Sequence, residues 1–161
     1  MRYAGLIEND FVNGIGVCVS IWMQGCPYRC KGCHNPSTWD DNGGMSINED
    51  DLINKVVSAI GKNGIKRNLS ILGGEPLYGK NPYFLYKLLL IVRTTYPNIA
   101  VFLWTGAERK EIEDMEKENK VITNLLELTN VVICGRFDVT KRDVSLPLVG
   151  SSNQEVIMLH K

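Results

Sequence analysis

Three of the five cysteines stand close together in the chain, as Cys26, Cys30 and Cys33. Their spacing is C-x3-C-x2-C, and they follow a stretch rich in β-branched and aromatic residues, 17–24, that predicts a strand. The carboxyl ends of parallel strands are where α/β folds place their chemistry. Three thiolates on one short loop can surround a single metal centre there, and the candidate centres differ in the number of ligands that they need.

Zinc and a ferredoxin-type electron carrier each need a fourth ligand. A structural zinc site takes four ligands, and the nearest candidate, His34, directly follows Cys33, so the two side chains seldom point at one ion. A carrier cluster takes four cysteines, but Cys18 and Cys134 lie in apolar runs typical of buried core residues. Both centres are kept as less favoured alternatives. The favoured interpretation is a [4Fe–4S] cluster on three thiolates, with its fourth iron open to a substrate or cofactor.

A second motif, Gly73-Gly74-Glu75-Pro76, follows the next predicted strand, 69–72. Glycines let the backbone approach a ligand closely, and a carboxylate pairs with an ammonium group. The alternative interpretation is an ordinary turn between a strand and a helix. The position of the motif, one strand–helix unit after the cysteines, favours the functional interpretation.

The elements that position these motifs alternate between strand and helix. Strands are expected at 17–24, 69–72, 99–104, 131–134 and 155–159, and helices are expected to begin near 48 and 81 and to span 108–128. Three consecutive strands start about 30 residues apart, the period of a βα unit, which implies a parallel sheet. A closed barrel typically needs about 250 residues. The 161 residues therefore predict an α/β fold, an open partial (β/α) barrel of five or six mainly parallel strands.

Residues 135–154 have no helical period and are expected to form a functional loop. His160, the penultimate residue, is expected to be frayed rather than catalytic. The sequence offers no acid–base pair for hydrolysis and no Ser-His-Asp arrangement. No catalytic residue is therefore expected beyond the cofactors.

The composition excludes several classes of protein. Eighteen lysines and arginines balance 18 aspartates and glutamates, which argues against nucleic-acid binding. No apolar run approaches the roughly 18 residues of a membrane span. The N-terminal residues include acids where a signal peptide needs an apolar stretch. With an odd number of cysteines, this indicates a cytoplasmic protein with reduced thiols. No linker divides the chain, so residues 1–161 are expected to form a single domain.

The cysteine spacing after the first strand and the Gly-Gly-Glu-Pro turn resemble the radical S-adenosylmethionine (SAM) enzymes. The resemblance implies a radical SAM type of barrel and one [4Fe–4S] cluster per chain, whose open iron chelates the amino and carboxylate groups of SAM. An electron from the cluster cleaves the sulfonium to give methionine and a 5′-deoxyadenosyl radical. The implied cluster ligands are Cys26, Cys30 and Cys33, and the implied SAM-binding residues are Gly32, Cys33, His34, Gly73, Gly74, Glu75 and Thr105.

One position departs from the superfamily pattern. An aromatic residue often precedes the third cysteine and contacts adenine, whereas this chain has Gly32 there and a ring at His34 instead. We infer that the loop from Gly32 to His34 lies against the adenine, with the ring contact moved or lost. The alternative is that His34 is a solvent-facing loop residue.

Further short segments of the sequence are similar to those of one group of these enzymes, the small glycyl-radical activases of anaerobic ribonucleoside-triphosphate reductase. They are Asn13-Gly14-Ile15-Gly16, Gly25-Cys26, residues 33–39 (CHNPSTW), Thr105-Gly106 and residues 150–154 (GSSNQ). The group usually has an arginine where this chain has Cys18. The role of that arginine is either dispensable or supplied elsewhere, for example by Arg29.

This resemblance implies a protein substrate, a backbone glycine in the large catalytic subunit of the reductase, which is left as a stable glycyl radical. It also implies a reduced flavodoxin-type protein as electron donor. A short, open barrel cannot close its own radical site against water, and a protein substrate can supply the missing wall. Two alternatives stay open: a small radical SAM enzyme that acts on a metabolite, and an iron–sulfur electron carrier.

Overall fold

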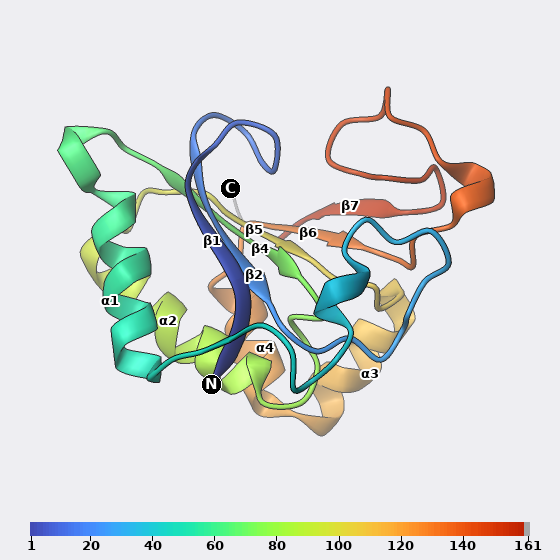
Figure 1. The fold of residues 1–161 in the computed structure, drawn as a ribbon, viewed down its shortest axis with the longest axis horizontal. Helices are drawn as coiled ribbons and strands as arrows, with labels where there is room; N and C mark the ends of the chain where they lie inside the picture. Colours follow the sequence, from blue (N-terminus) through green and yellow to red (C-terminus); the bar gives the residue numbers. More distant parts are fainter. Residues whose placement is uncertain (160–161) are drawn as a thin grey trace.

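One open sheet organises the protein. The computed structural model describes residues 1–159, so the expectation for His160 lies outside the described residues. Its strands lie in the order β3-β1-β2-β4-β5-β6-β7 (Figure 1). They are β1 (Arg2–Asp10), β2 (Cys18–Met23), β3 (Met45–Ser46), β4 (Asn68–Gly73), β5 (Val101–Trp104), β6 (Val131–Cys134) and β7 (Glu155–Met158). Strands β2, β4, β5 and β6 are parallel, whereas β1, β3 and β7 are antiparallel to their neighbours. The architecture is mixed α/β, with a sheet that is parallel in its middle and not closed.

The sheet has seven strands, more than the five or six expected. The expected strands correspond to β2, β4, β5, β6 and β7. The two that were missed, β1 and β3, form one margin of the sheet. Acids and Gly5 interrupt the alternation in β1, which pairs with β2 through two shifts of register. Strand β3 has two residues, too few to carry a pattern.

The helices are α1 (Glu49–Ile60), α2 (Asn81–Thr95), α3 (Arg109–Glu118) and α4 (Lys120–Glu127), with 3₁₀ turns at Pro36–Thr38, Lys62–Gly64 and Val139–Lys141. Helix α1 begins as expected, because Asn48 accepts a hydrogen bond from the Asp50 N–H (2.8 Å). The single helix expected at 108–128 is instead two. Asn119 takes an extended conformation (φ −136°, ψ 100°) and caps α4 by accepting from the Val121 N–H (3.0 Å).

The two faces of the sheet are covered differently. Figure 1 shows the helices gathered on one side of the sheet and two long loops on the other. On the helix side, Ile21 and Leu103 are fully buried in the main core. On the other side, Phe102 packs with Leu148 and neighbouring residues of the C-terminal loop. The loop between β1 and β2 covers the same side, where the Ser70 hydroxyl donates to the Asn13 carbonyl.

The two cysteines outside the cluster of three are core residues, as expected. Cys18 and Cys134 are both fully buried. None of the helices formed by residues 1–159 is long and apolar enough to cross a membrane.

Candidate functional site

The cysteine loop, residues 26–33, follows β2 at its carboxyl end. Gly25, in a left-handed conformation (φ 90°), turns the chain out of the strand. The Gly25 N–H donates to the Thr38 carbonyl (2.8 Å), and the Cys26 N–H donates to the Trp39 carbonyl (3.2 Å). The CHNPSTW segment therefore closes the loop and holds its base against the end of the strand.

The first thiol faces two backbone N–H groups. Burial raises the pKa of Cys26, and hydrogen bonds from the backbones of Tyr28 and Arg29 act against that rise. Arg29 has a left-handed backbone (φ 46°), uncommon for a residue with a Cβ. The loop therefore turns back on itself beside the Cys26 sulfur.

The other two thiols also accept backbone hydrogen bonds. Burial raises the pKa of Cys30, and a hydrogen bond from the Phe137 backbone lowers it. The Asn35 N–H donates to the Cys33 sulfur (3.4 Å). All three cysteines are free and half-buried. Hydrogen bonds to sulfur favour the thiolate and tune iron–sulfur centres, so the surroundings suit thiolate ligands.

A single ion has no ready site in this arrangement. Within residues 1–159, no three His, Cys, Asp or Glu side chains converge closely enough to hold one metal ion. A [4Fe–4S] cluster instead bonds each cysteine to a different iron and so spreads its ligands more widely.

The Gly-Gly-Glu turn packs directly on the beginning of the cysteine loop. A Cβ on Gly73 would collide with the backbone of Met23, and one on Gly74 would collide with the Gly25 carbonyl. The Gly74 N–H donates to the Met23 carbonyl (2.9 Å), and the Glu75 N–H donates to the Gly25 carbonyl (2.7 Å). In the structure, these glycines therefore let the turn pack closely against the chain's own backbone at Met23 and Gly25.

Glu75 is a buried carboxylate, only 2% exposed. One oxygen accepts from the Leu77 N–H (2.9 Å) and the Thr105 hydroxyl (2.7 Å), and the other accepts from the Gly106 N–H (2.8 Å). Burial raises the pKa of Glu75, and these hydrogen bonds oppose the rise. No residue between 1 and 159 forms an ion pair with it.

The Tyr28 side chain connects the cysteine loop to Gly106, after β5, and to Arg136, after β6. The sequence did not reveal these contacts. The Tyr28 ring packs so closely on Gly106 that a Cβ on Gly106 would lie only 2.5 Å from the nearest ring atom. The Arg136 guanidinium lies 4.3 Å from the centre of the Tyr28 ring and forms two hydrogen bonds to Glu111 (2.7 and 2.8 Å). The hydrogen bond from Arg136 lowers the pKa of Glu111 to about 2. These contacts join residues far apart in the sequence, so no local pattern could have revealed them.

The GSSNQ segment holds the chain that follows β6. The Gln154 amide nitrogen donates to the Gly135 carbonyl (2.9 Å), and its oxygen accepts from the Gly150 N–H (2.8 Å). The Asn153 amide donates to the Arg136 carbonyl (2.9 Å). The side-chain amides of this segment therefore fix the loop that carries Arg136.

The sequence-predicted residues gather at the carboxyl edge of the sheet in two groups. The beginning of the cysteine loop, the Gly-Gly-Glu turn and Thr105 meet at the ends of β2, β4 and β5. Gly32 and the exposed His34 instead lie against residues that follow β6. Cys18 is the first residue of β2, whereas Arg29 lies in the loop that follows the other end of this strand.

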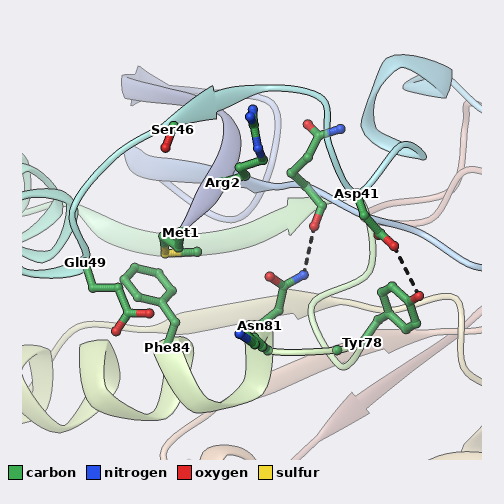
Figure 2. A pocket seen from close by; sticks show the side chains of 11 residues that line it. Met1, Arg2, Asp41, Ser46, Glu49, Tyr78, Asn81 and Phe84 are labelled. Atoms are coloured by element: carbon green, nitrogen blue, oxygen red, sulfur yellow. Dashed lines mark hydrogen bonds between the residues drawn. The ribbon is translucent and has the colours of Figure 1, made fainter.

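A cavity of about 550 Å³ lies behind this edge, where Arg2, Asp41, Glu49 and Phe84 line it (Figure 2). None of the sequence-predicted site residues lines it. Its wall includes Asn81, whose amide donates to the carbonyls of Gln24 (3.1 Å) and Glu75 (2.9 Å). The cavity therefore borders the Asn81 side chain, which holds the Gly-Gly-Glu turn in place through these hydrogen bonds.

Comparisons with known proteins identify the family of the chain. A family model described as a 4Fe-4S single cluster domain matches residues 12–157. The chain is 34% identical over 157 residues to the anaerobic ribonucleoside-triphosphate reductase-activating protein of Escherichia coli (strain K12), with 97% of each chain covered. It is 31% identical to the protein of that name from Vibrio cholerae, with the same coverage. The protein of that name from Enterobacteria phage T4 is 30% identical over 86% of this chain and 82% of its own.

Gly74→Ala should destabilise the protein, because the new methyl group would collide with the Gly25 carbonyl. Overpacking of this kind costs about 1–3 kcal/mol, measured as the free energy of unfolding in denaturant. Gly5→Ala is the matched control, since a Cβ there meets nothing within 4 Å. Equal stability of the two variants would contradict the described packing.

Glu111→Gln should lower stability near neutral pH and lose its effect in acid. The pKa of Glu111 falls from an ordinary 4.5 to about 2 in the folded protein, so its contribution is complete above 4.5 and disappears as the pH falls through 2. The measurement is the unfolding free energy of both proteins from pH 7 to pH 2. Glu113→Gln, at an exposed position of α3, is the control. A stability difference that persists unchanged at pH 2 would contradict the assignment.

Proposed function

The chain belongs to the anaerobic ribonucleoside-triphosphate reductase-activating proteins, with a 4Fe-4S single cluster domain, and on that premise we propose that it forms a glycyl radical on the large catalytic subunit of the reductase. The proposed co-substrate is SAM. The observation that carries this proposal is the buried Glu75 carboxylate at the start of the loop that holds the three cysteines, which has hydrogen-bond donors but no ion-pair partner in the described chain.

Cys26, Cys30 and Cys33 are the proposed ligands of one [4Fe–4S] cluster. Thiolates are the usual ligands of such clusters, and backbone N–H groups face all three sulfurs. When bound, the cluster supplies the electron that splits SAM into methionine and the 5′-deoxyadenosyl radical that takes a hydrogen atom from the substrate glycine.

Glu75 is the proposed acceptor for the ammonium group of SAM. A buried carboxylate is costly unless it is paired. The charge of Arg136 acts on Glu75 without forming an ion pair, and an ammonium group would supply a direct partner. Thr105 fixes one carboxylate oxygen through its hydroxyl, and Gly73 and Gly74 bring the turn against the cysteine loop. Gly32, Cys33 and His34 are the proposed neighbours of the adenine.

The open sheet supports a protein as the substrate. We propose that residues 1–161 form a single domain, a partial barrel of the radical SAM type whose parallel part is β2, β4, β5 and β6. A reactive radical has to be kept from water, and an inserted loop of the reductase would supply the wall that the chain lacks. The proposed electron donor is a reduced flavodoxin-type protein.

Anaerobic reconstitution followed by electron paramagnetic resonance (EPR) tests the function. We expect the cluster spectrum to change when SAM is added, and a glycyl-radical doublet to appear only when the reductase is also present. A carrier cluster with four cysteine ligands would not respond to SAM, and an enzyme acting on a metabolite would turn over without the reductase.

The same preparation tests the ligands. Alanine in place of Cys26, Cys30 or Cys33 should abolish cluster assembly, measured as iron content. Cys18→Ser should leave the cluster intact, because Cys18 lies at the far end of β2. Loss of the cluster in Cys18→Ser would refute the ligand assignment.

Glu75→Gln should weaken SAM binding while the cluster still assembles. A hydrogen bond to a charged group contributes about 1.5–3 kcal/mol, so we expect SAM affinity to fall about 10- to 100-fold. The measurement is equilibrium binding of SAM to the reconstituted protein, with Glu113→Gln as the control. Unchanged affinity in Glu75→Gln would remove Glu75 from the SAM site.

A further inference from the structure

An aromatic ring from a distant part of the chain lies beside Gly32. The nearest atom of the Phe137 ring is 3.6 Å from the place where a Cβ on Gly32 would be. The opposite edge of the same ring lies 3.2 Å from the corresponding place on Gly150. The centres of the Phe137 and His34 rings are 5.5 Å apart, with their planes tilted by 44°. The two rings therefore form an aromatic corner at the end of the cysteine loop.

The backbone on both sides of Phe137 is fixed. Its own N–H faces the Cys30 thiol. The preceding residue, Arg136, accepts a hydrogen bond from Asn153 through its carbonyl (2.9 Å), and the following residue, Asp138, donates its N–H to the Ser151 hydroxyl (3.1 Å). The ring is nevertheless only half-buried. An apolar ring held rigidly but left partly open is suited to contact a flat ligand.

The site offers different chemistry at its two ends. The Glu75 carboxylate lies where β4 and β5 end, and the aromatic corner lies beyond the end of β6. SAM has a matching polarity, with an ammonium group at one end and a flat purine at the other. Gly32 allows the corner to form, because a Cβ there would lie within 3.2 Å of Val139 and because its own backbone is left-handed (φ 77°).

We propose that Phe137, from the loop after β6, is the aromatic surface on which the adenine of SAM stacks. The inference rests on the proposed function, because SAM is the ligand. Aromatic side chains stack on nucleobases through their faces, and the loss of one such contact weakens binding measurably. The loop after β6 thus determines how the nucleoside end of the co-substrate is held, and the Gly-Gly-Glu turn determines how its amino-acid end is held.

Equilibrium binding of SAM to the reconstituted holoprotein tests this role, with the SAM-induced change in the cluster EPR spectrum as a second readout. Phe137→Ala should weaken SAM binding about tenfold, equivalent to about 1.4 kcal/mol. Phe137→Leu should also weaken it, because leucine fills the space against Gly150 without an aromatic face. Phe137→Trp should bind SAM like the parent protein.

Two controls separate stacking from general damage. Phe11→Ala removes a ring that is 73% exposed on the loop between β1 and β2, so SAM binding should not change. Methionine, which lacks the purine, should bind equally well to the parent protein and to Phe137→Leu. Equal loss of methionine binding would overturn the inference, since the ring would then support the whole site.

The remaining outcomes are also decisive. Parent-like SAM binding by Phe137→Leu would show that only apolar volume is needed and would overturn the stacking role. Tighter binding by Phe137→Ala would overturn it too, because the ring would then occupy the place of the base. Failure of the parent holoprotein to bind SAM would instead refute the proposed function, and this inference with it.

Discussion

Hydrogen bonds to the Glu75 carboxylate join the ends of two neighbouring parallel strands. Its oxygens accept from Thr105 and Gly106 beyond β5, while its own N–H donates to Gly25 at the start of the cysteine loop. Gly106 in turn lies beneath the Tyr28 ring of that loop. An ionised group buried at this point is tolerated only if its lone pairs are satisfied. The three donors meet that need in part, and a cationic ligand would complete it. The same carboxylate thus aligns the turn, the loop and the strand ends around the place where SAM is proposed to bind.

The way the sheet ends explains why so short a chain leaves its site open. Each parallel strand from β2 to β6 follows its neighbour through a helical connection, but β7 returns antiparallel to β6 and β1 lies antiparallel to β2. Antiparallel strands on both flanks interrupt the βα progression that would otherwise continue towards a closed barrel. Loops rather than helices then cover the second face, where Leu148 and Val149 pack near Phe102. The sheet is therefore not closed, and the proposed SAM site lies along its open carboxyl edge.

Much of this arrangement was predictable from local sequence, and the rest depends on contacts between distant residues. The period of the strands, the cap at Asn48 and the position of the cysteine loop follow from patterns within a few residues. The capping role of Asn119, which divides the helix expected at 108–128, was not distinguished from a polar surface position. The glycine at position 74 indicated that another group packs closely against the backbone there. It did not show that this group is the Gly25 carbonyl, because the absence of a Cβ does not identify the neighbouring atoms. The contact of Arg136 with Tyr28 joins two segments whose side chains have no local signal in common.

The C-terminal segment belongs to the site for a physical reason that its distance in sequence conceals. The carbonyl groups of Gly135 and Arg136 extend beyond the end of β6, where backbone acceptors need partners. Gln154 and Asn153 supply those partners from their side chains and so fix the start of the loop after β6. That order is what brings the Phe137 backbone to the Cys30 thiol. The loop after β6 therefore contacts the GSSNQ segment on one side and the cysteine loop on the other, which gives a structural reason for both to occur in the same chain.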